Sequence, residues 1–156
     1  MSNENLMNQA IQLAQQNVVS GHGGPFGAIV VKAGKIIGRG VNEVTSSCDP
    51  TAHAEVQAIR EACNNLNDFQ LNGCVIYTSC EPCPMCIGAI YWARPDAVYY
   101  ACTKEEAAII GFDDQFIYEQ IALPMEDRSI IMSQIYPPES KLPFETWSTS
   151  VQKIEY

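Results

Sequence analysis

Two short segments of the sequence carry side chains that can bind a metal ion. One of them is Pro82-Cys83-Pro84-Met85-Cys86, in which two thiols are three residues apart at the expected start of a helix. Residues at this spacing share one face of a helix, and the positive end of the helix dipole favours thiolates. Such a CxxC pair is equally typical of a redox dithiol, half of a structural zinc site, or two small core residues. The pair alone leaves these alternatives open.

The other segment, His53-Ala54-Glu55, also lies near an expected helix start and favours the metal interpretation. Between the two segments, a helix of ~14 residues would travel ~21 Å and a strand of about five residues would return ~17 Å, so we expect the segments to lie close together. His53, Cys83 and Cys86 then supply three ligands to a tetrahedral zinc and leave the fourth position for water, whereas structural zinc sites are closed by four ligands. Glu55 points ~200° away from His53 around an ideal helix, so we expect it to transfer protons and not to bind the metal.

Length and composition limit the class of protein. With 156 residues, 47% of them hydrophobic and 17% charged, the chain fits one domain, residues 1–156, with one core. Nine basic against eighteen acidic residues give a net charge of −9, which disfavours nucleic acid as a partner. The sequence has no apolar stretch of the ~18–20 residues that a membrane span needs, and it begins without signal-peptide features, so we expect a cytoplasmic protein with no membrane partner. In that compartment its seven cysteines favour metal or catalytic use over disulfides.

The spacing of apolar residues predicts helices that alternate with strands. Leu6, Ala10, Ala14 and Val18 mark a first helix that ends near Gly21, and Ala33-Gly34 is the expected turn of an antiparallel hairpin. Further helices are expected at 51–66, where Asp49 is the N-cap, and at 82–93, 103–111, 113–121 and, weakly, 144–154. The expected strands are 26–32, 35–41, 74–78 and 97–101, with an extended segment at 129–135. This order favours an α/β sandwich that contains parallel strands.

Together the two segments form the H-x-E…P-C-x-x-C signature, and the sequence resembles the cytidine deaminase superfamily. Within that superfamily it is most similar to the bacterial guanine deaminase branch, and the resemblance covers nearly the whole chain. The matching segments are Gly24-Pro25-Phe26-Gly27-Ala28, Asn42, residues 49–55, residues 78–86, residues 90–94, Gly111-Phe112-Asp113-Asp114 and the Glu155-Tyr156 terminus. The resemblance implies a three-layer α/β/α sandwich of the cytidine deaminase-like type with a central mixed sheet.

The resemblance also implies roles for individual residues. His53, Cys83 and Cys86 match the ligands of one Zn²⁺ per subunit, and Glu55 matches the catalytic proton shuttle. Asp114 matches an acidic residue that binds the amino edge of the substrate and assists proton transfer. The remaining matches are to residues that contact or enclose the substrate: Phe26, Asn42, Ala54, Trp92 and Tyr156.

These roles imply an enzyme that hydrolyses guanine to xanthine and ammonia in purine base catabolism. In the guanine branch the C-terminal segment is exchanged between two subunits, so a homodimer is implied, and the expected partner is a small nucleobase. Deamination of tRNA adenosine or of cytosine or cytidine at the same zinc is an alternative, and the acidic balance disfavours the RNA substrate. A non-catalytic structural zinc module is an alternative from another class.

Simpler interpretations exist for several of these residues. Phe26 and Trp92 are also compatible with a core or a dimer interface, and Asp113-Asp114 with the first turn of a helix. His22 is expected in a loop near the pocket mouth, and Cys80 is not expected to bind the metal. The other cysteines are expected to be small buried residues: Cys48, Cys63, Cys74 and Cys102.

Overall fold

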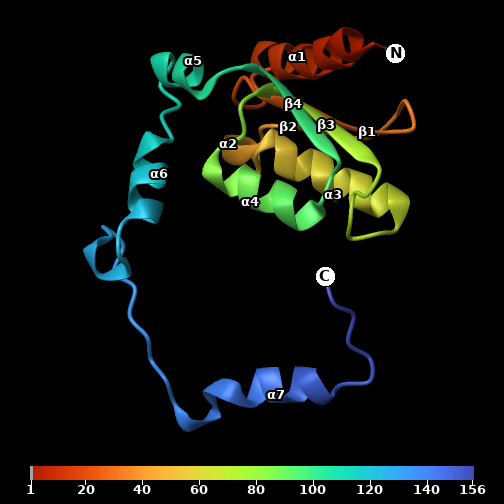
Figure 1. Ribbon diagram of the computed structural model, residues 1–156. Helices are drawn as coiled ribbons and strands as arrows, with labels where there is room; N and C mark the ends of the chain where they lie inside the picture. Colours follow the sequence, from red (N-terminus) through yellow and green to blue (C-terminus); the bar gives the residue numbers. More distant parts are fainter. Residues whose placement is uncertain (1) are drawn as a thin grey trace. The chain divides into compact units, whose positions relative to one another are not determined.

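The computed structural model describes residues 2–156, and these form two compact units, one up to Gln115 and a second at Phe116–Tyr156. The first unit is built on a four-stranded sheet with the order β2-β1-β3-β4 (Figure 1). Its strands are β1 (Gly27–Lys32), β2 (Lys35–Val41), β3 (Cys74–Cys80) and β4 (Ala97–Cys102). Strand β1 is antiparallel to β2 and β3, whereas β3 and β4 are parallel, so the expected mixed sheet is confirmed.

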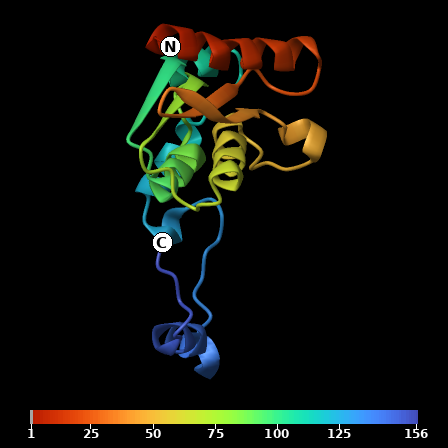
Figure 2. The same ribbon diagram turned by 90° about the vertical axis from the view of Figure 1, so that its right-hand side faces the viewer.

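Helices cover both faces of this sheet and complete the three expected layers. Helix α1 (Asn3–Val19) lies on one face, and α3 (Ala54–Leu66) and α4 (Pro84–Ala93) lie on the other (Figures 1 and 2). Side chains alternate along a strand, so β1 contributes to both cores. Ala28 and Val30 join the cluster with α3 and α4, while Ile29 and Val31 join the cluster with α1.

Small residues let α3 approach the sheet closely. Ala54, Ala58 and Ala62 repeat every four residues on one face of α3, and each is fully buried. Opposite them, β2 carries Gly38 and Gly40, where a Cβ atom would overlap the helix backbone. Contact between backbones therefore fixes the distance from α3 to the sheet, and with it the position of the residues at the start of the helix.

The predicted elements agree with the structure except at several boundaries. Helix α1 ends at Val19, followed by Gly21 at φ 69°, and the hairpin turns through Ala33 and Gly34 with φ angles of 48° and 76°. The prediction that a helix starts at residue 51 with Asp49 as N-cap was wrong. Asp49 Oδ1 instead accepts hydrogen bonds from the Thr51 backbone N–H (2.8 Å) and hydroxyl (2.7 Å), which closes a turn ahead of α3. Similarly, α4 begins at Pro84 and not at Pro82.

The remaining elements are short. They are α2 (Val44–Ser47), α5 (Lys104–Ile109), α6 (Gln115–Ala122), α7 (Leu142–Thr149) and the 3₁₀ turns η1 (Met125–Asp127) and η2 (Pro138–Lys141). Residues 129–135 form no strand, and the second unit has no buried residue among those described. No helix within residues 2–156 is long and apolar enough to cross a membrane.

We predict that Gly40→Ala lowers the free energy of unfolding by about 3 kcal/mol, because the added methyl group overlaps the Ala54 carbonyl and the Ala58 amide nitrogen. Chemical denaturation measures the change. Gly88→Ala is the matched control: Gly88 is exposed on α4, a Cβ there meets nothing within 4 Å, and alanine favours helix. Equal stability of the two variants would contradict the close packing of α3 on β2.

Candidate metal and deaminase site

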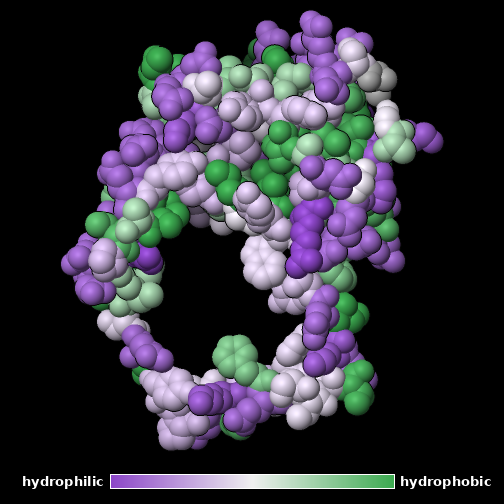
Figure 3. All heavy atoms as spheres, viewed as in Figure 1, coloured by the Kyte–Doolittle hydropathy of each residue, from purple (hydrophilic) through white to green (hydrophobic). Residues whose placement is uncertain are grey.

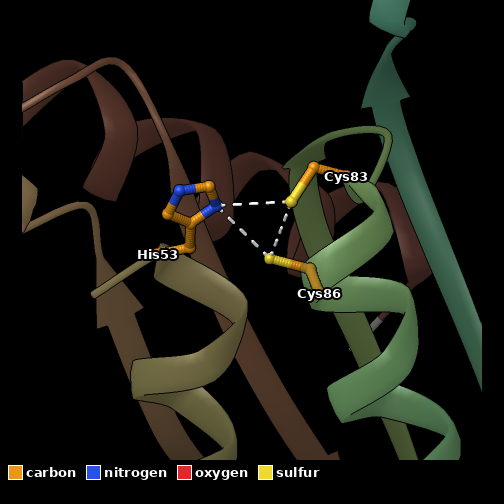
Figure 4. Close-up of side chains that lie close together, drawn as sticks. All are labelled: His53, Cys83 and Cys86. Carbon is orange, nitrogen blue, oxygen red and sulfur yellow. Dashed lines mark hydrogen bonds between the residues drawn. The ribbon is translucent and has the colours of Figure 1, made fainter. Parts of the chain in front are cut away.

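The first turns of α3 and α4 lie beside each other and carry the predicted metal ligands. His53 is the N-cap of α3 and Cys83 is the N-cap of α4, both with extended backbone and neither with a side-chain capping bond. Their side chains are therefore free to extend past the helix ends, where they meet that of Cys86 (Figure 4). The loop before Cys83 is held in place because Glu81 accepts a hydrogen bond from the Lys104 N–H at 3.1 Å.

The distances within this cluster fit a zinc ion. Cys83 Sγ and Cys86 Sγ each lie 3.5 Å from His53 Nδ1, and the two sulfurs lie 3.5 Å apart. A tetrahedral zinc with Zn–S of about 2.3 Å and Zn–N of about 2.05 Å places its sulfurs about 3.8 Å apart and sulfur about 3.6 Å from nitrogen. The three atoms thus already have nearly the spacing of three corners of a zinc tetrahedron. Among the described residues, this is the cluster of three that could hold a metal ion.

The electrostatics of the cluster favour a thiolate. The hydrogen bond between Cys83 and Cys86 is the largest cause that lowers the pKa of Cys83, and with the contact to His53 it brings this pKa to about 4. The same hydrogen bond raises the pKa of Cys86, which holds the proton that the pair shares. The contact with Cys83 raises the pKa of His53. Because a metal binds the deprotonated form of a thiol, the proton on Cys86 must leave when zinc is bound.

Glu55 lies next to the cluster and is buried, with 6% of its surface exposed. The Thr78 hydroxyl donates to Glu55 Oε1 at 3.0 Å, and Glu55 Oε2 lies 3.4 Å from Cys86 Sγ. Burial raises the pKa of this carboxyl group, so it holds a proton more readily than an exposed glutamate. The arrangement fits a group that takes up and releases protons beside the metal.

Asn42 directly follows β2, and hydrogen bonds to its side-chain oxygen hold it in place. Its Oδ1 accepts from the backbone N–H groups of Gly24 (3.3 Å) and Val44 (3.4 Å). Its Nδ2 has no hydrogen-bond partner within residues 2–156. Every fully buried side-chain N or O atom in that range has a partner, so Nδ2 is not fully buried and is accessible to solvent. Asn42 therefore has an amide donor that no described residue occupies.

The segment after α5 folds back onto the start of β1. The rings of Phe26 and Phe112 meet edge to face, with centroids 4.9 Å apart and planes at 89°. Two residues further on, Asp114 is partly buried, and this burial and the negative charge of Cys83 raise its pKa. Asp113 Oδ1 instead accepts from the Gln115 N–H at 2.9 Å, which closes a turn ahead of α6, so this helix begins at Gln115 and not at Asp113. The two neighbouring acids thus have different surroundings.

The other predicted substrate-contacting residues differ in their surroundings. The side chain of Ala54 is fully buried in the core, so any substrate contact would involve its backbone. Trp92, near the end of α4, is 63% exposed, which excludes the core interpretation for it. Tyr156 belongs to the second unit and is 69% exposed. The substrate roles of all three stay predictions.

The remaining cysteines differ from one another. Cys74 is buried as expected and Cys63 is partly buried, but Cys48 and Cys102 are exposed, so the prediction for these two was wrong. Cys48 follows the short helix α2, and Cys102 ends β4 at the edge of the sheet. Cys80 Sγ lies 3.6 Å from the Thr103 carbonyl, and burial raises its pKa to about 11. It takes no part in the metal cluster.

Two contributors to the site had no assigned role in the sequence analysis. Thr78 donates a hydrogen bond to Glu55, and the available signal was the pair of small hydroxyl residues Thr78-Ser79 at the end of a buried strand. Phe112 packs on Phe26 across a long stretch of chain, which no local pattern indicates.

We predict that Cys86→Ala loses its zinc, because two ligands remain where three are needed to hold the ion. Metal analysis of the purified protein would measure zinc per chain. Cys80→Ala is the matched control and should keep one zinc, since Cys80 lies outside the cluster. Full zinc occupancy in Cys86→Ala would refute the assigned ligands.

Comparison with known proteins agrees with this geometry over the whole chain. The chain is 54% identical over 156 residues to the guanine deaminase of Bacillus subtilis (strain 168), covering 100% of both chains. An X-ray structure of guanine deaminase from Bacillus subtilis matches with a TM-score of 0.98 at 54% identity, across 100% of this chain and 99% of that one. A tRNA-specific adenosine deaminase of Aquifex aeolicus is 37% identical over 120 residues, which are 72% of this chain and 80% of that protein.

The match to a protein family covers the part of the chain that holds the metal cluster. Residues 1–102 match the family described as the cytidine and deoxycytidylate deaminase zinc-binding region. This range includes both helix N-termini and the sheet between them, and the expected cytidine deaminase-like fold is confirmed. The chain therefore belongs to the cytidine and deoxycytidylate deaminase family and carries the zinc-binding region of that family.

Proposed function

We propose that the protein is a zinc-dependent guanine deaminase, which hydrolyses guanine to xanthine and ammonia in the breakdown of purine bases. The observation that carries this proposal is the similarity over both units to the guanine deaminase of Bacillus subtilis, at 54% identity. The match to the tRNA-specific adenosine deaminase, in contrast, covers 72% of this chain. The net charge of −9 also fits a small neutral base better than a polyanionic RNA.

The catalytic chemistry is divided between the metal and Glu55. Zinc bound to His53, Cys83 and Cys86 would act as a Lewis acid that activates a water molecule near neutral pH. Glu55 accepts the proton of that water and delivers it to the amino group that leaves as ammonia. Its burial, and the hydrogen bond from Thr78 to one of its oxygens, hold the carboxyl group in one orientation for both transfers.

Recognition of the base begins with Asn42. Because its Oδ1 is occupied by two backbone N–H groups, the group that it offers to the substrate is the Nδ2 donor. Guanine presents carbonyl and ring-nitrogen acceptors to such a donor, so the Nδ2 group of Asn42 fits guanine as the substrate.

Asp114 and the aromatic pair complete the proposed pocket. A carboxylate at Asp114 accepts hydrogen bonds from the adjacent ring N–H and amino group of guanine, and its raised pKa suits assistance in proton transfer. Phe26, braced by Phe112, supplies an apolar wall for the purine ring. Ala54, through its backbone, and Trp92 are proposed to line the remainder of the pocket.

We further propose a homodimer in which each C-terminal segment covers the partner. The second unit has no buried residue among those described, yet it exposes many large apolar side chains. In the first unit, Tyr99, Tyr100, Tyr91 and Trp92 are 45–79% exposed, and the outer edge of β4 pairs with no strand in residues 2–156. Apolar groups (green) reach the surface of both units in Figure 3. Exchange of the segments would bury both surfaces and bring Tyr156 to the partner's pocket.

We predict that the purified zinc protein releases ammonia from guanine, and that Glu55→Gln lowers kcat at least about 1,000-fold while zinc stays bound, because the amide cannot carry the proton. A spectrophotometric assay of xanthine formation measures this. Glu61→Gln is the matched control: Glu61 is exposed on the same helix and should keep full activity.

The same assay with cytosine, cytidine and adenosine separates the alternatives. No xanthine from guanine would overturn the proposed substrate, and turnover of one of the other bases would replace it. Full activity of Glu55→Gln would exclude the assigned proton shuttle. A protein that binds zinc and deaminates none of these compounds would be the non-catalytic module.

We predict that two inactive variants complement each other if the segments are exchanged. Glu55→Gln lacks the proton shuttle, and a variant without residues 151–156 lacks Tyr156. After refolding together at equal amounts, half of the dimers would be mixed and each would contain one complete site, giving about a quarter of wild-type activity. Activity no higher than that of the separate variants, although ultracentrifugation shows mixed dimers, would rule out the exchange.

A further inference from the structure

A buried amide on α1 links the two loops beside the proposed base pocket. Asn17 is 4% exposed, although its neighbours on the buried face of α1 are Leu6, Ala10 and Ala14. Its Nδ2 donates two hydrogen bonds, to the Gly24 carbonyl and to the Asn42 carbonyl, both at 2.8 Å. A single side chain thus holds two segments that lie 18 residues apart in the sequence.

These two segments also bind each other. The Asn42 backbone N–H donates to the Phe26 carbonyl at 3.1 Å, and Asn42 Oδ1 accepts from the Gly24 N–H at 3.3 Å. Asn17, Asn42 and the segment of residues 24–26 therefore form a closed hydrogen-bond network, in which Asn17 donates to the carbonyls of Gly24 and Asn42. Asn42 and Phe26, the residues proposed to contact the base, both belong to it.

The space around these hydrogen bonds is tightly filled. A Cβ atom on Gly23 would overlap the Asn42 carbonyl and come within 3.0 Å of Asn17 Nδ2, so the Gly23 backbone packs directly on this hydrogen bond. Loss of the Asn17 donors would leave the Asn42 carbonyl in this tight space without this partner, whereas the Gly24 carbonyl would keep the Phe26 N–H at 2.9 Å. The loops would have to move for the Asn42 carbonyl to find water. Such a movement would shift the Asn42 amide that is proposed to contact the base.

We propose that Asn17 is a positioning residue for base recognition: it acts through Asn42, fixing the direction of the Nδ2 donor, and does not touch the substrate. The inference rests on the proposed function only in that Asn42 contacts the base. A purely structural role would instead stabilise the contact between α1 and the sheet without affecting recognition.

A double-mutant cycle separates these two roles. Asn17→Asp keeps the shape of the side chain and removes both donors, and Asn8→Asp, on the exposed surface of the same helix, is the matched control with the same charge change. We expect Asn17→Asp to raise KM for guanine roughly 10-fold or more with a smaller change in kcat, at unchanged zinc content, and Asn8→Asp to have no effect. Combined with Asn42→Ala, Asn17→Asp should change kcat/KM by less than about 3-fold, because the group through which it acts is gone.

Other outcomes would overturn the proposal. It fails if Asn17→Asp lowers kcat/KM equally with and without the Asn42 side chain, if it lowers kcat alone, or if it has no effect. If Asn17→Asp does not fold, Asn17→Ser, which adds no charge and leaves space for water, is measured by the same cycle and the same criteria apply. If the wild-type protein does not deaminate guanine, the proposed function fails by itself, and the cycle is run with the base that is turned over.

Discussion

The site depends on one constraint, which is that α3 and α4 begin at the same end of the sheet. The chain leaves this end along α3 and returns along β3, so that His53 and Cys83, 30 residues apart in the sequence, meet at 3.5 Å. Both residues are N-caps with extended backbone, which directs their side chains beyond the helix ends. The dipoles of two helices point at the cluster, and this favours the thiolates that a metal requires.

The packing of the helices converts this topology into a defined distance. Alanines on α3 rest on Gly38 and Gly40 of β2, and because these contacts involve the backbone they leave little freedom for the helix to shift. The face of β3 that supports the core with Ile76 also carries Thr78 to the Glu55 carboxyl group. The hydrophobic core and the proposed catalytic site are thus parts of the same interface between α3 and the sheet.

Sequence patterns predicted the regular elements well where apolar periodicity was strong, as in α1 and the β1–β2 hairpin. They failed at the start of α3, because Asp49 followed by proline is as typical of a turn as of a helix N-cap, and the hydrogen bonds to Thr51 decide for the turn. Burial of Cys102 was also predicted wrongly. Residue type gives an average burial, whereas the position of β4 at the edge of the sheet leaves this cysteine exposed.

The sequence by itself determined the chemistry: a histidine, a glutamate and two cysteines at spacings that suit one zinc and one proton shuttle. Within each segment short-range spacing sufficed, because helix geometry fixes which neighbouring residues share a direction. The meeting of the two segments followed from the lengths of the helix and the strand between them. The tertiary structure alone decided which distant groups contact the proposed site residues, among them Thr78 on Glu55, Phe112 on Phe26, and Asn17 on the loops that carry Asn42. Such contacts join segments whose separation along the chain carries no periodic signal, so only the packing of the helices and the sheet brings them together.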